Sequence, residues 1–213
     1  MDRIADIRKE YKMQTLNEKQ VAEEPIAQFT KWWDDAIQSK IDEVNACTLA
    51  TASLQGKPSA RIVLLKGYDD KGFVFYTNYE SNKGCELAEN PQASMVFFWK
   101  ELQRQVRIEG IVEKVTAAES DAYFSSRPAG SRIGAWASPQ SQVIKDRSVI
   151  EDNEEKYTKQ YADGTIPRPS YWGGYRLNPQ LVEFWQGRPS RLHDRIQYTL
   201  EKNGNWKIAR LAP

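Results

Sequence analysis

Histidine and cysteine are scarce in this chain: its 213 residues include one histidine, His193, and two cysteines, Cys47 and Cys85. These side chains lack the spacing of metal ligands, so no metal site is expected. Two distant cysteines are typical of a protein with reduced thiols, which favours a cytoplasmic location. There is no apolar run long enough to cross a bilayer and no signal-peptide core, so neither a membrane protein nor a secreted one is expected.

The sequence also lacks an excess of charge and several well-known nucleotide motifs. Thirty basic residues face 29 acidic ones, for a formal net charge of +1, which argues against a general nucleic-acid-binding protein. GxGxxG, P-loop and GxSxG patterns are absent, so a Rossmann dinucleotide site has no support. Any anion must therefore be bound by local clusters of basic residues. With 40% hydrophobic and 28% charged residues, the chain is expected to fold around a core.

Apolar periodicity divides the chain into helical and extended segments. Residues 1–20 are interpreted as a helical arm, and residues 21–213 as a single domain. A helix within residues 23–41 is expected to bury Ile26, Phe29, Trp33 and Ile37, and further helices are predicted at 81–90, 116–127 and 146–164. Strands are predicted at 46–53, 60–68, 73–77, 93–99, 104–115, 181–187, 192–201 and 206–212, with a Pro- and Gly-marked loop at 165–175. The fold class is mainly β with flanking helices (α+β), as an antiparallel, Greek-key-like barrel or sandwich.

The only histidine lies in "RLHDR", residues 191–195. If this segment is a strand, Arg191, His193 and Arg195 share one face, and the two arginines stand about 13 Å apart. Such a row of cations suits a long, flat, anionic ligand. The competing interpretation is a solvated strand face with an Asp–Arg surface pair.

Three further segments carry basic or hydroxyl side chains. "RIVLLK" places Arg61 and Lys66 at the two ends of an apolar strand, where they either contact phosphates or are simply its solvated ends. In "AYFSSRPAGS", Tyr123 and Arg127 lie one helical turn apart and Ser131 follows Pro128.

The third segment, "TNYESNKG", opens a short helix with Ser81 and Lys83. An ordinary N-cap explains this segment equally well, and a dipole-stabilised helix end explains "AYFSSRPAGS" equally well. Two phosphate-bearing ligands would account for all these clusters, but spacing alone does not name them.

The ordered set of these segments resembles the pyridoxamine/pyridoxine 5′-phosphate oxidase family. The resemblance rests on "RIVLLK", "FVFYTN", "FFWKELQRQVRIEG", "YFSSRP", "SRIGAWASPQSQ", "WGGYR", "EFWQG", "RLHDR" and the terminal "RLAP". It implies a split β-barrel that binds FMN, and a homodimer with both flavin sites at the subunit interface. It also implies oxidation of pyridoxamine or pyridoxine 5′-phosphate to pyridoxal 5′-phosphate by hydride transfer from C4′ to flavin N5, with O2 reoxidising the flavin to give hydrogen peroxide.

The resemblance also implies roles for individual residues. FMN would be bound by Arg61, Ile62, Val63, Leu64, Leu65, Lys66, Tyr76, Thr77, Asn82, Lys83, Gln105, Gln140, Ser141, Trp185 and Arg195. Substrate would be bound by Arg8, Tyr11, Lys66, Tyr123, Arg127, Ser131, Arg191 and His193, with Arg8 and Tyr11 on an arm that acts as a lid. Catalysis would involve Arg191, His193 and Arg195. The family commonly has Arg-Lys where this chain has Asn82–Lys83, so one phosphate contact is expected to be weaker.

Two other functions fit parts of the pattern. A related split-barrel flavoenzyme acting on another heterocycle would retain the flavin residues but not the substrate set, which is present here. A non-enzymatic carrier of pyridoxal phosphate would not need the flavin residues. The sequence does not indicate the preference between amine and alcohol substrates, the strength of the dimer, or a second pyridoxal phosphate site.

Overall fold

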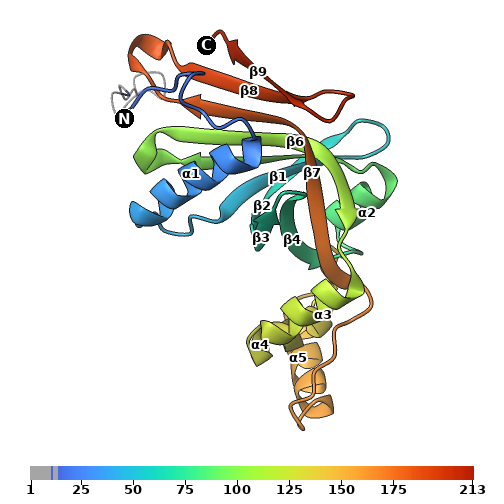
Figure 1. Ribbon diagram of the computed structural model, residues 1–213. Helices are drawn as coiled ribbons and strands as arrows, with labels where there is room; N and C mark the ends of the chain where they lie inside the picture. Colours follow the sequence, from blue (N-terminus) through green and yellow to red (C-terminus); the bar gives the residue numbers. More distant parts are fainter. Residues whose placement is uncertain (1–10, 12–13) are drawn as a thin grey trace, which may run out of the picture.

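The computed structural model describes Tyr11 and residues 14–213, so Arg8 and most of the expected N-terminal helix lie outside the described residues. These residues form a nine-stranded antiparallel sheet (Figure 1). Its strands are β1 (Ala46–Ala52), β2 (Pro58–Leu64), β3 (Gly67–Asp69), β4 (Gly72–Asn78), β5 (Gln92–Trp99), β6 (Arg104–Lys114), β7 (Trp172–Gln186), β8 (Asp194–Leu200) and β9 (Trp206–Leu211). The predicted fold class, mainly β with flanking helices, is confirmed.

The strand order of the main part of the sheet is β2-β1-β5-β6-β7-β4-β3. Its two ends, β2 and β3, are joined in the chain by only Leu65 and Lys66. The Lys66 N–H donates to the Val74 carbonyl at 2.8 Å and ties this connection to β4. The short connection keeps the two end strands close, so the sheet forms an open, split barrel, and the β8–β9 hairpin extends it from the C-terminal half of β7.

The core is built from apolar faces of the strands and of helix α1 (Pro25–Gln38). Pro25 occupies the first helical turn, where its missing N–H is not needed. The buried stripe of α1 includes Phe29, Trp32 and Ala36, whereas Ile37 is 50% exposed. The prediction that Ile37 is buried was therefore wrong. Trp32 and Ala36 continue the helical spacing from Phe29, and Ile37 lies beyond that buried stripe.

Helices α3 (Ala117–Ser126), α4 (Ala129–Ala137) and α5 (Ser148–Gln160) form a group that projects from the barrel (Figure 1). Thr116 and Glu119 begin α3 with a reciprocal capping box. A small apolar cluster of Phe124, Ile133, Ile166 and Trp172 joins these helices to the start of β7. Helix α2 (Asn82–Glu89) lies where the sequence predicts a short helix, whereas α4 was not predicted.

Strand β7 is much longer than predicted and includes part of the expected loop. Gly173 and Gly174 lie inside β7, at positions with no room for a side chain. A Cβ at Gly173 would lie 2.1 Å from the Tyr79 hydroxyl, and a Cβ at Gly174 would lie 2.6 Å from Val115. Pro179 lies at a register shift between β6 and β7, where a strand tolerates proline. Here glycine and proline indicate close packing and a bulge rather than a loop.

The segment that contains the histidine differs from the prediction. Residues Pro189–Arg191 form a 3-10 turn, and β8 begins only at Asp194. Ser190 and Arg191 have φ values of 55° and 61°, which breaks the alternation of an extended strand. The expectation that Arg191, His193 and Arg195 share one strand face is therefore wrong.

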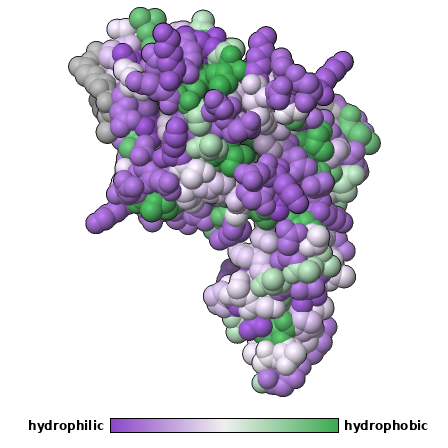
Figure 2. Space-filling model, in the orientation of Figure 1, coloured by the Kyte–Doolittle hydropathy of each residue, from purple (hydrophilic) through white to green (hydrophobic). Residues whose placement is uncertain are grey.

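Figure 2 shows that polar and charged side chains cover most of the visible face of the barrel. Among the described residues, no helix combines the length and apolar character needed to cross a bilayer.

Candidate functional site

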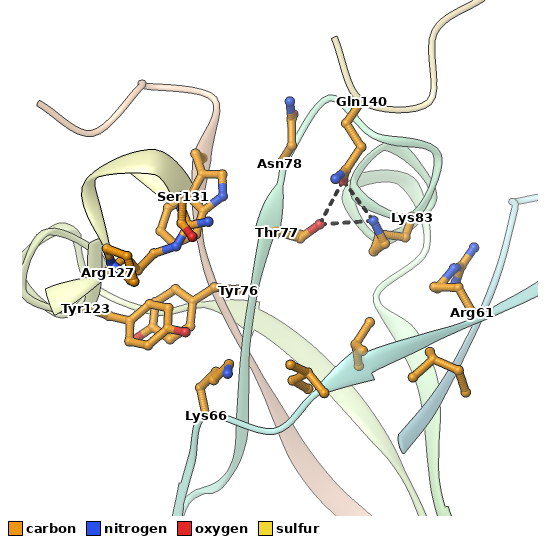
Figure 3. A pocket seen from close by; sticks show the side chains of 15 residues that line it. Arg61, Lys66, Tyr76, Thr77, Asn78, Lys83, Tyr123, Arg127, Ser131 and Gln140 are labelled. Atoms are coloured by element: carbon orange, nitrogen blue, oxygen red, sulfur yellow. Dashed lines mark hydrogen bonds between the residues drawn. The ribbon is translucent and has the colours of Figure 1, made fainter. Parts of the chain in front are cut away.

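A pocket of about 550 Å³ opens beside β2 and β4, where the barrel meets the projecting helices (Figure 3). Most of the residues predicted to bind two phosphates line it together. Its walls are formed by Arg61, Ile62, Val63, Leu64, Lys66, Tyr76, Thr77, Asn78, Lys83, Tyr123, Arg127, Pro128, Ser131, Gln140 and Trp172. Segments far apart in the sequence thus converge on one cationic cavity.

Lys83 is held at one side of the pocket by neutral acceptors. Its ammonium group donates to Thr77 Oγ1 and Gln140 Oε1, both at 3.0 Å (Figure 3). It also donates to Ser81 Oγ at 3.2 Å. Burial, followed by the nearby charge of Arg61, lowers the pKa of Lys83 below its usual value. An anion bound here would relieve both effects.

Arg61, on β2, is oriented by polar groups of β1, of β2 and of α2. Its guanidinium donates to Ser59 Oγ at 2.5 Å and to the Leu49 carbonyl at 3.3 Å, and forms an ion pair with Glu86 at 3.4 Å. Burial alone would raise the pKa of Glu86, but hydrogen bonds from Ser59 and Thr51 and the charge of Arg61 lower it. Glu86, which sequence reasoning missed, therefore stays ionised and fixes the orientation of Arg61.

Stacked aromatic rings form the other side of the pocket. The rings of Tyr76 and Tyr123 lie 3.9 Å apart, and those of Tyr76 and Trp172 lie 5.5 Å apart. The Arg127 guanidinium carbon lies 4.7 Å from the centre of the Trp172 ring. Arg127 Nη1 is buried without a hydrogen-bond partner, and burial lowers the pKa of this guanidinium. With Ser131 and Lys66 nearby (Figure 3), this side is a second place for an anion.

Some predicted residues border this pocket without lining it. Leu65 is 4% exposed and belongs to the barrel core. Asn82 is an exposed first residue of α2, and Ser141 follows Gln140 with a φ of 69°. Conversely, Asn78, Pro128 and Trp172 line the pocket but were not predicted. Trp172 gave no functional signal because a tryptophan next to two glycines is equally typical of a core.

A second group of predicted residues gathers near the start of β8. The rings of Trp185 and His193 lie 4.6 Å apart, and Tyr11 lies 5.8 Å from Trp185 and 6.0 Å from His193. The Arg188 N–H donates to His193 Nδ1 at 3.0 Å. Burial, and then the charge of Arg191, lowers the pKa of His193. The neutral imidazole therefore carries its proton on Nε2.

Arg195 lies beside this group and is paired with a buried carboxylate. Its Nε and Nη2 donate to the two oxygens of Glu183 at 2.7 and 3.1 Å, and Arg107 donates to the same carboxylate at 2.6 Å. Burial alone would raise the pKa of Glu183, but these hydrogen bonds outweigh it and hold the pKa below its usual value. Gln105 is the cross-strand neighbour of Trp185. The sequence gave no signal that Glu183 would pair with these arginines.

The two groups lie at opposite ends of the long strand β7. Trp172 at its start lines the pocket, whereas Trp185 near its end contacts His193, and the strand between them spans about 40 Å along its path. Large apolar side chains are exposed at both places: Ile62 at the pocket is 66% exposed and Leu192 beside His193 is 68% exposed. Within one chain, the described residues form two separate parts of the predicted site.

The fold is that of the split-barrel proteins. PhzG from Burkholderia lata, solved in complex with tetrahydrophenazine-1-carboxylic acid, superimposes with a TM-score of 0.89 at 31% identity, covering 96% of this chain and 100% of that one. A pyridoxamine 5′-phosphate oxidase-related, FMN binding protein from Nostoc punctiforme shares the fold with a TM-score of 0.70 at 17% identity, covering 91% and 100%.

Sequence comparison identifies the family within this class. Residues 33–161 match the pyridoxamine 5′-phosphate oxidase family, and residues 172–213 match the pyridoxine 5′-phosphate oxidase C-terminal dimerisation region. The chain is 57% identical to the pyridoxine/pyridoxamine 5′-phosphate oxidase of Cupriavidus pinatubonensis over the full length of both. It is 57% identical to the enzyme of the same name from Cyanothece sp. over 99% of this chain and 98% of that one. The protein therefore belongs to the pyridoxamine 5′-phosphate oxidase family and is an oxidoreductase.

Proposed function

We propose that this protein oxidises pyridoxamine 5′-phosphate or pyridoxine 5′-phosphate to pyridoxal 5′-phosphate, with FMN as its cofactor. FMN would supply the redox chemistry as the acceptor of a hydride from C4′ of the substrate, and O2 would take up the two electrons and give hydrogen peroxide. With the amine substrate, water would complete the conversion to the aldehyde and ammonia would be released. The protein supplies binding, orientation and electrostatic stabilisation. The high identity to relatives of that name over the whole chain supports this assignment.

The observation that carries the proposal is a single pocket with a partly buried cation that lacks an ion-pair partner on each of two sides. Lys83 and Arg127 both have lowered pKa values because they are buried, and neither forms an ion pair among the described residues. A phosphate on each side would satisfy them. FMN and a phosphorylated pyridine each bring one phosphate, and their rings would lie between the two sides.

We assign the side that contains Lys83 to the cofactor. Arg61 and Lys83 would bind the FMN phosphate, and Thr77 and Gln140 keep the ammonium group of Lys83 in place. The remaining cofactor contacts are assigned to Ile62, Val63, Leu64, Leu65, Lys66, Tyr76, Asn82 and Ser141. Asn82 offers no positive charge at the phosphate, so Arg61 and Lys83 provide most of the electrostatic attraction.

We assign the aromatic side to the substrate. Arg127, Tyr123, Ser131 and Lys66 would bind its phosphate, with the free Nη1 of Arg127 as the strongest donor. A planar guanidinium binds phosphate through two parallel hydrogen bonds, whereas lysine acts as a point charge. The stack of Tyr76, Tyr123 and Trp172 keeps Arg127 at this side before substrate arrives.

The second group is assigned to the same site through a homodimer. A two-fold symmetric partner would bring its own Trp185, His193 and Arg195 to the pocket, together with Tyr11, Gln105 and Arg191. Residues 172–213, which match a dimerisation region, include most of this group. The exposed Ile62 and Leu192 give each half-site an apolar surface to bury.

The proposed roles of the second group follow from its electrostatics. Arg195 is held by Glu183 and would stabilise the negative charge that develops on the cofactor during hydride transfer. Arg191 and the neutral His193 would orient the substrate ring, with the Nε2 proton of His193 available to its hydroxyl or amine. We also propose that residues 1–20 form an arm that covers the substrate. A cytoplasmic location of the protein is a further part of the proposal.

Anaerobic addition of substrate to the purified protein tests this function. The protein should be yellow, lose its absorbance near the flavin maximum when pyridoxine 5′-phosphate or pyridoxamine 5′-phosphate is added, and regain it with oxygen. A colourless protein that FMN does not reconstitute, but that binds pyridoxal phosphate, would instead be a carrier. A yellow protein bleached only by a phosphate-free heterocycle would act as a related flavoenzyme.

A further inference from the structure

The segment of residues 14–22, which we call the strap, runs across the C-terminal strands without forming secondary-structure pairs with them. Side chains hold its backbone instead. The Leu16 N–H donates to Asp194 Oδ2 at 3.1 Å, and the Leu16 carbonyl accepts from Arg210 Nη2 at 2.9 Å. The Tyr198 hydroxyl donates to the Ala22 carbonyl at 2.7 Å at the other end.

Three charged residues, Glu18, Asp194 and Arg210, form what we call the clasp. Arg210 donates to both oxygens of Glu18 at 2.8 and 2.7 Å, and its Nη1 donates to Asp194 at 2.8 Å. Hydrogen bonds from Arg210 lower the pKa of Glu18 to about 2, so the clasp remains ionised at neutral pH. The arginine on β9 thus links the strap to the first residue of β8.

The clasp is connected directly to the second group of site residues, around His193. Asp194 follows His193 in the chain and lies 3.6 Å from Arg188 Nε. Arg188 donates through its side chain to the Gln14 carbonyl at 3.2 Å and through its backbone to His193 at 3.0 Å. Arg188 therefore contacts the strap, the clasp and the imidazole of His193.

Tyr11 lies a few residues before the start of the strap. Tyr11 precedes Gln14 by three residues, and its ring packs over the backbone of Gly187, where a Cβ would lie 2.8 Å from the ring. On this surface it contacts Trp185 and His193. An arm fastened at Leu16 and Glu18 leaves Tyr11 only a short tether, which restricts it to this surface.

We propose that Glu18, Asp194 and Arg210 are positioning residues that hold Tyr11 against His193 and thereby preorganise the substrate side of the site. This inference rests on the proposed function, since it concerns binding of the substrate and product. A clasp that merely fastened the terminus would affect hydrogen exchange and stability. Loss of a clasp that positions Tyr11 would also weaken binding of the pyridine ligand, while leaving the affinity for FMN unchanged.

The test combines ligand affinity with hydrogen exchange in the FMN-loaded dimer. Glu18→Gln, Arg210→Gln and the double variant are compared with Lys207→Gln, which removes a charge from the same strand but lies outside the clasp. The readouts are the Kd for pyridoxal 5′-phosphate, KM and kcat for pyridoxine 5′-phosphate, the Kd for FMN, and exchange of the Leu16 amide. Gly187→Ala is added because its methyl group displaces Tyr11 without touching the clasp.

Arg210→Gln should raise the Kd for pyridoxal 5′-phosphate and the KM about three- to tenfold, the range expected for a partly exposed ion-pair network. The Leu16 amide should exchange faster, while kcat and the FMN affinity stay close to those of Lys207→Gln. The double variant should be no worse than Arg210→Gln, since both changes break the same pair. Gly187→Ala should reproduce the loss of affinity with normal exchange at Leu16.

Three results would overturn the inference, and the first two are faster exchange at Leu16 with unchanged affinity for pyridoxal 5′-phosphate, and equal losses of pyridoxal phosphate and FMN affinity. Unchanged exchange in Arg210→Gln would also overturn it, since the clasp would then not hold the strap. A parent protein that binds neither FMN nor pyridoxal 5′-phosphate would instead contradict the proposed function.

Discussion

Replacing Arg127 by methionine separates what this residue does for binding from what it does for folding. In the free protein its guanidinium lies over Trp172, and Nη1 is buried without a partner. Methionine keeps a long apolar side chain on the tryptophan ring but removes the charge and its donors. The proposed function predicts weaker binding of phosphorylated substrate without any loss of stability.

Arg127→Met should weaken substrate binding but leave the stability of the free protein unchanged or higher. A hydrogen bond to a charged group contributes about 1.5–3 kcal/mol, which corresponds to a roughly 10- to 150-fold rise in KM. In the free protein, the variant loses a cation–π contact of about 0.5–1 kcal/mol. It also removes an unsatisfied buried donor, whose desolvation costs about 1–3 kcal/mol. Because the second effect is larger, the melting temperature of the FMN-free protein should stay the same or rise.

Steady-state peroxide formation with pyridoxine 5′-phosphate gives KM, and thermal unfolding monitored by tryptophan fluorescence gives the stability. Arg127→Lys serves as the matched control, because it keeps the charge but loses the two-pronged geometry, and it should show an intermediate KM. The FMN affinity of both variants should equal that of the parent. An unchanged KM in Arg127→Met would place the substrate phosphate elsewhere, and a large loss of stability would show that Arg127 has a partner in the free protein.

Three further predictions concern the remaining charged groups. Lys83→Met should raise the Kd for FMN about 10- to 100-fold. In the parent, FMN affinity measured by fluorescence should fall as the pH rises through the lowered pKa of Lys83, since only the protonated amine attracts phosphate; a flat profile would contradict this. Glu183→Gln should destabilise the fold by about 2 kcal/mol in urea titrations, the size of a hydrogen bond to a charged group. Because the folded-state pKa of Glu183 is lowered, its stabilisation is present above the usual carboxyl pKa and is lost as the pH falls through the lowered value; equal stability of parent and variant at pH 7 would refute this. Arg191→Ala should reduce kcat/KM more than His193→Ala, which should retain FMN; the reverse order would exclude a charge-based role for Arg191.

Sequence patterns were sufficient for the strands and helices with clear periodicity. Alternation in β5 and β6 and the amphipathic stripe of α1 reflect contacts with one core, so their positions follow from local sequence. Glycine and proline were ambiguous in β7, because Gly173 and Pro179 serve tertiary packing and a bulge rather than a turn. The left-handed residues at 190 and 191 likewise had no local signal, since neither is a glycine.

The site was predicted as a set of residue types, but its spatial arrangement was not. Clusters such as those around Arg61 and Arg127 indicate anion binding from composition alone. The sequence does not show which carboxylate faces which arginine, so Glu86 and Glu183 were missed. Nor does it show that the residues at the two ends of β7 belong to separate halves within one chain.

That separation has a genetic consequence in the proposed dimer. A chain that carries Lys83→Met and a chain that carries Arg191→Ala are defective in different halves, so a mixed dimer contains one doubly damaged site and one with both halves native. Random reassociation of equal amounts would give about half mixed dimers, and hence about a quarter of the native activity, from two preparations that are each impaired alone. Complementation of this kind requires that each catalytic centre draw on both polypeptides.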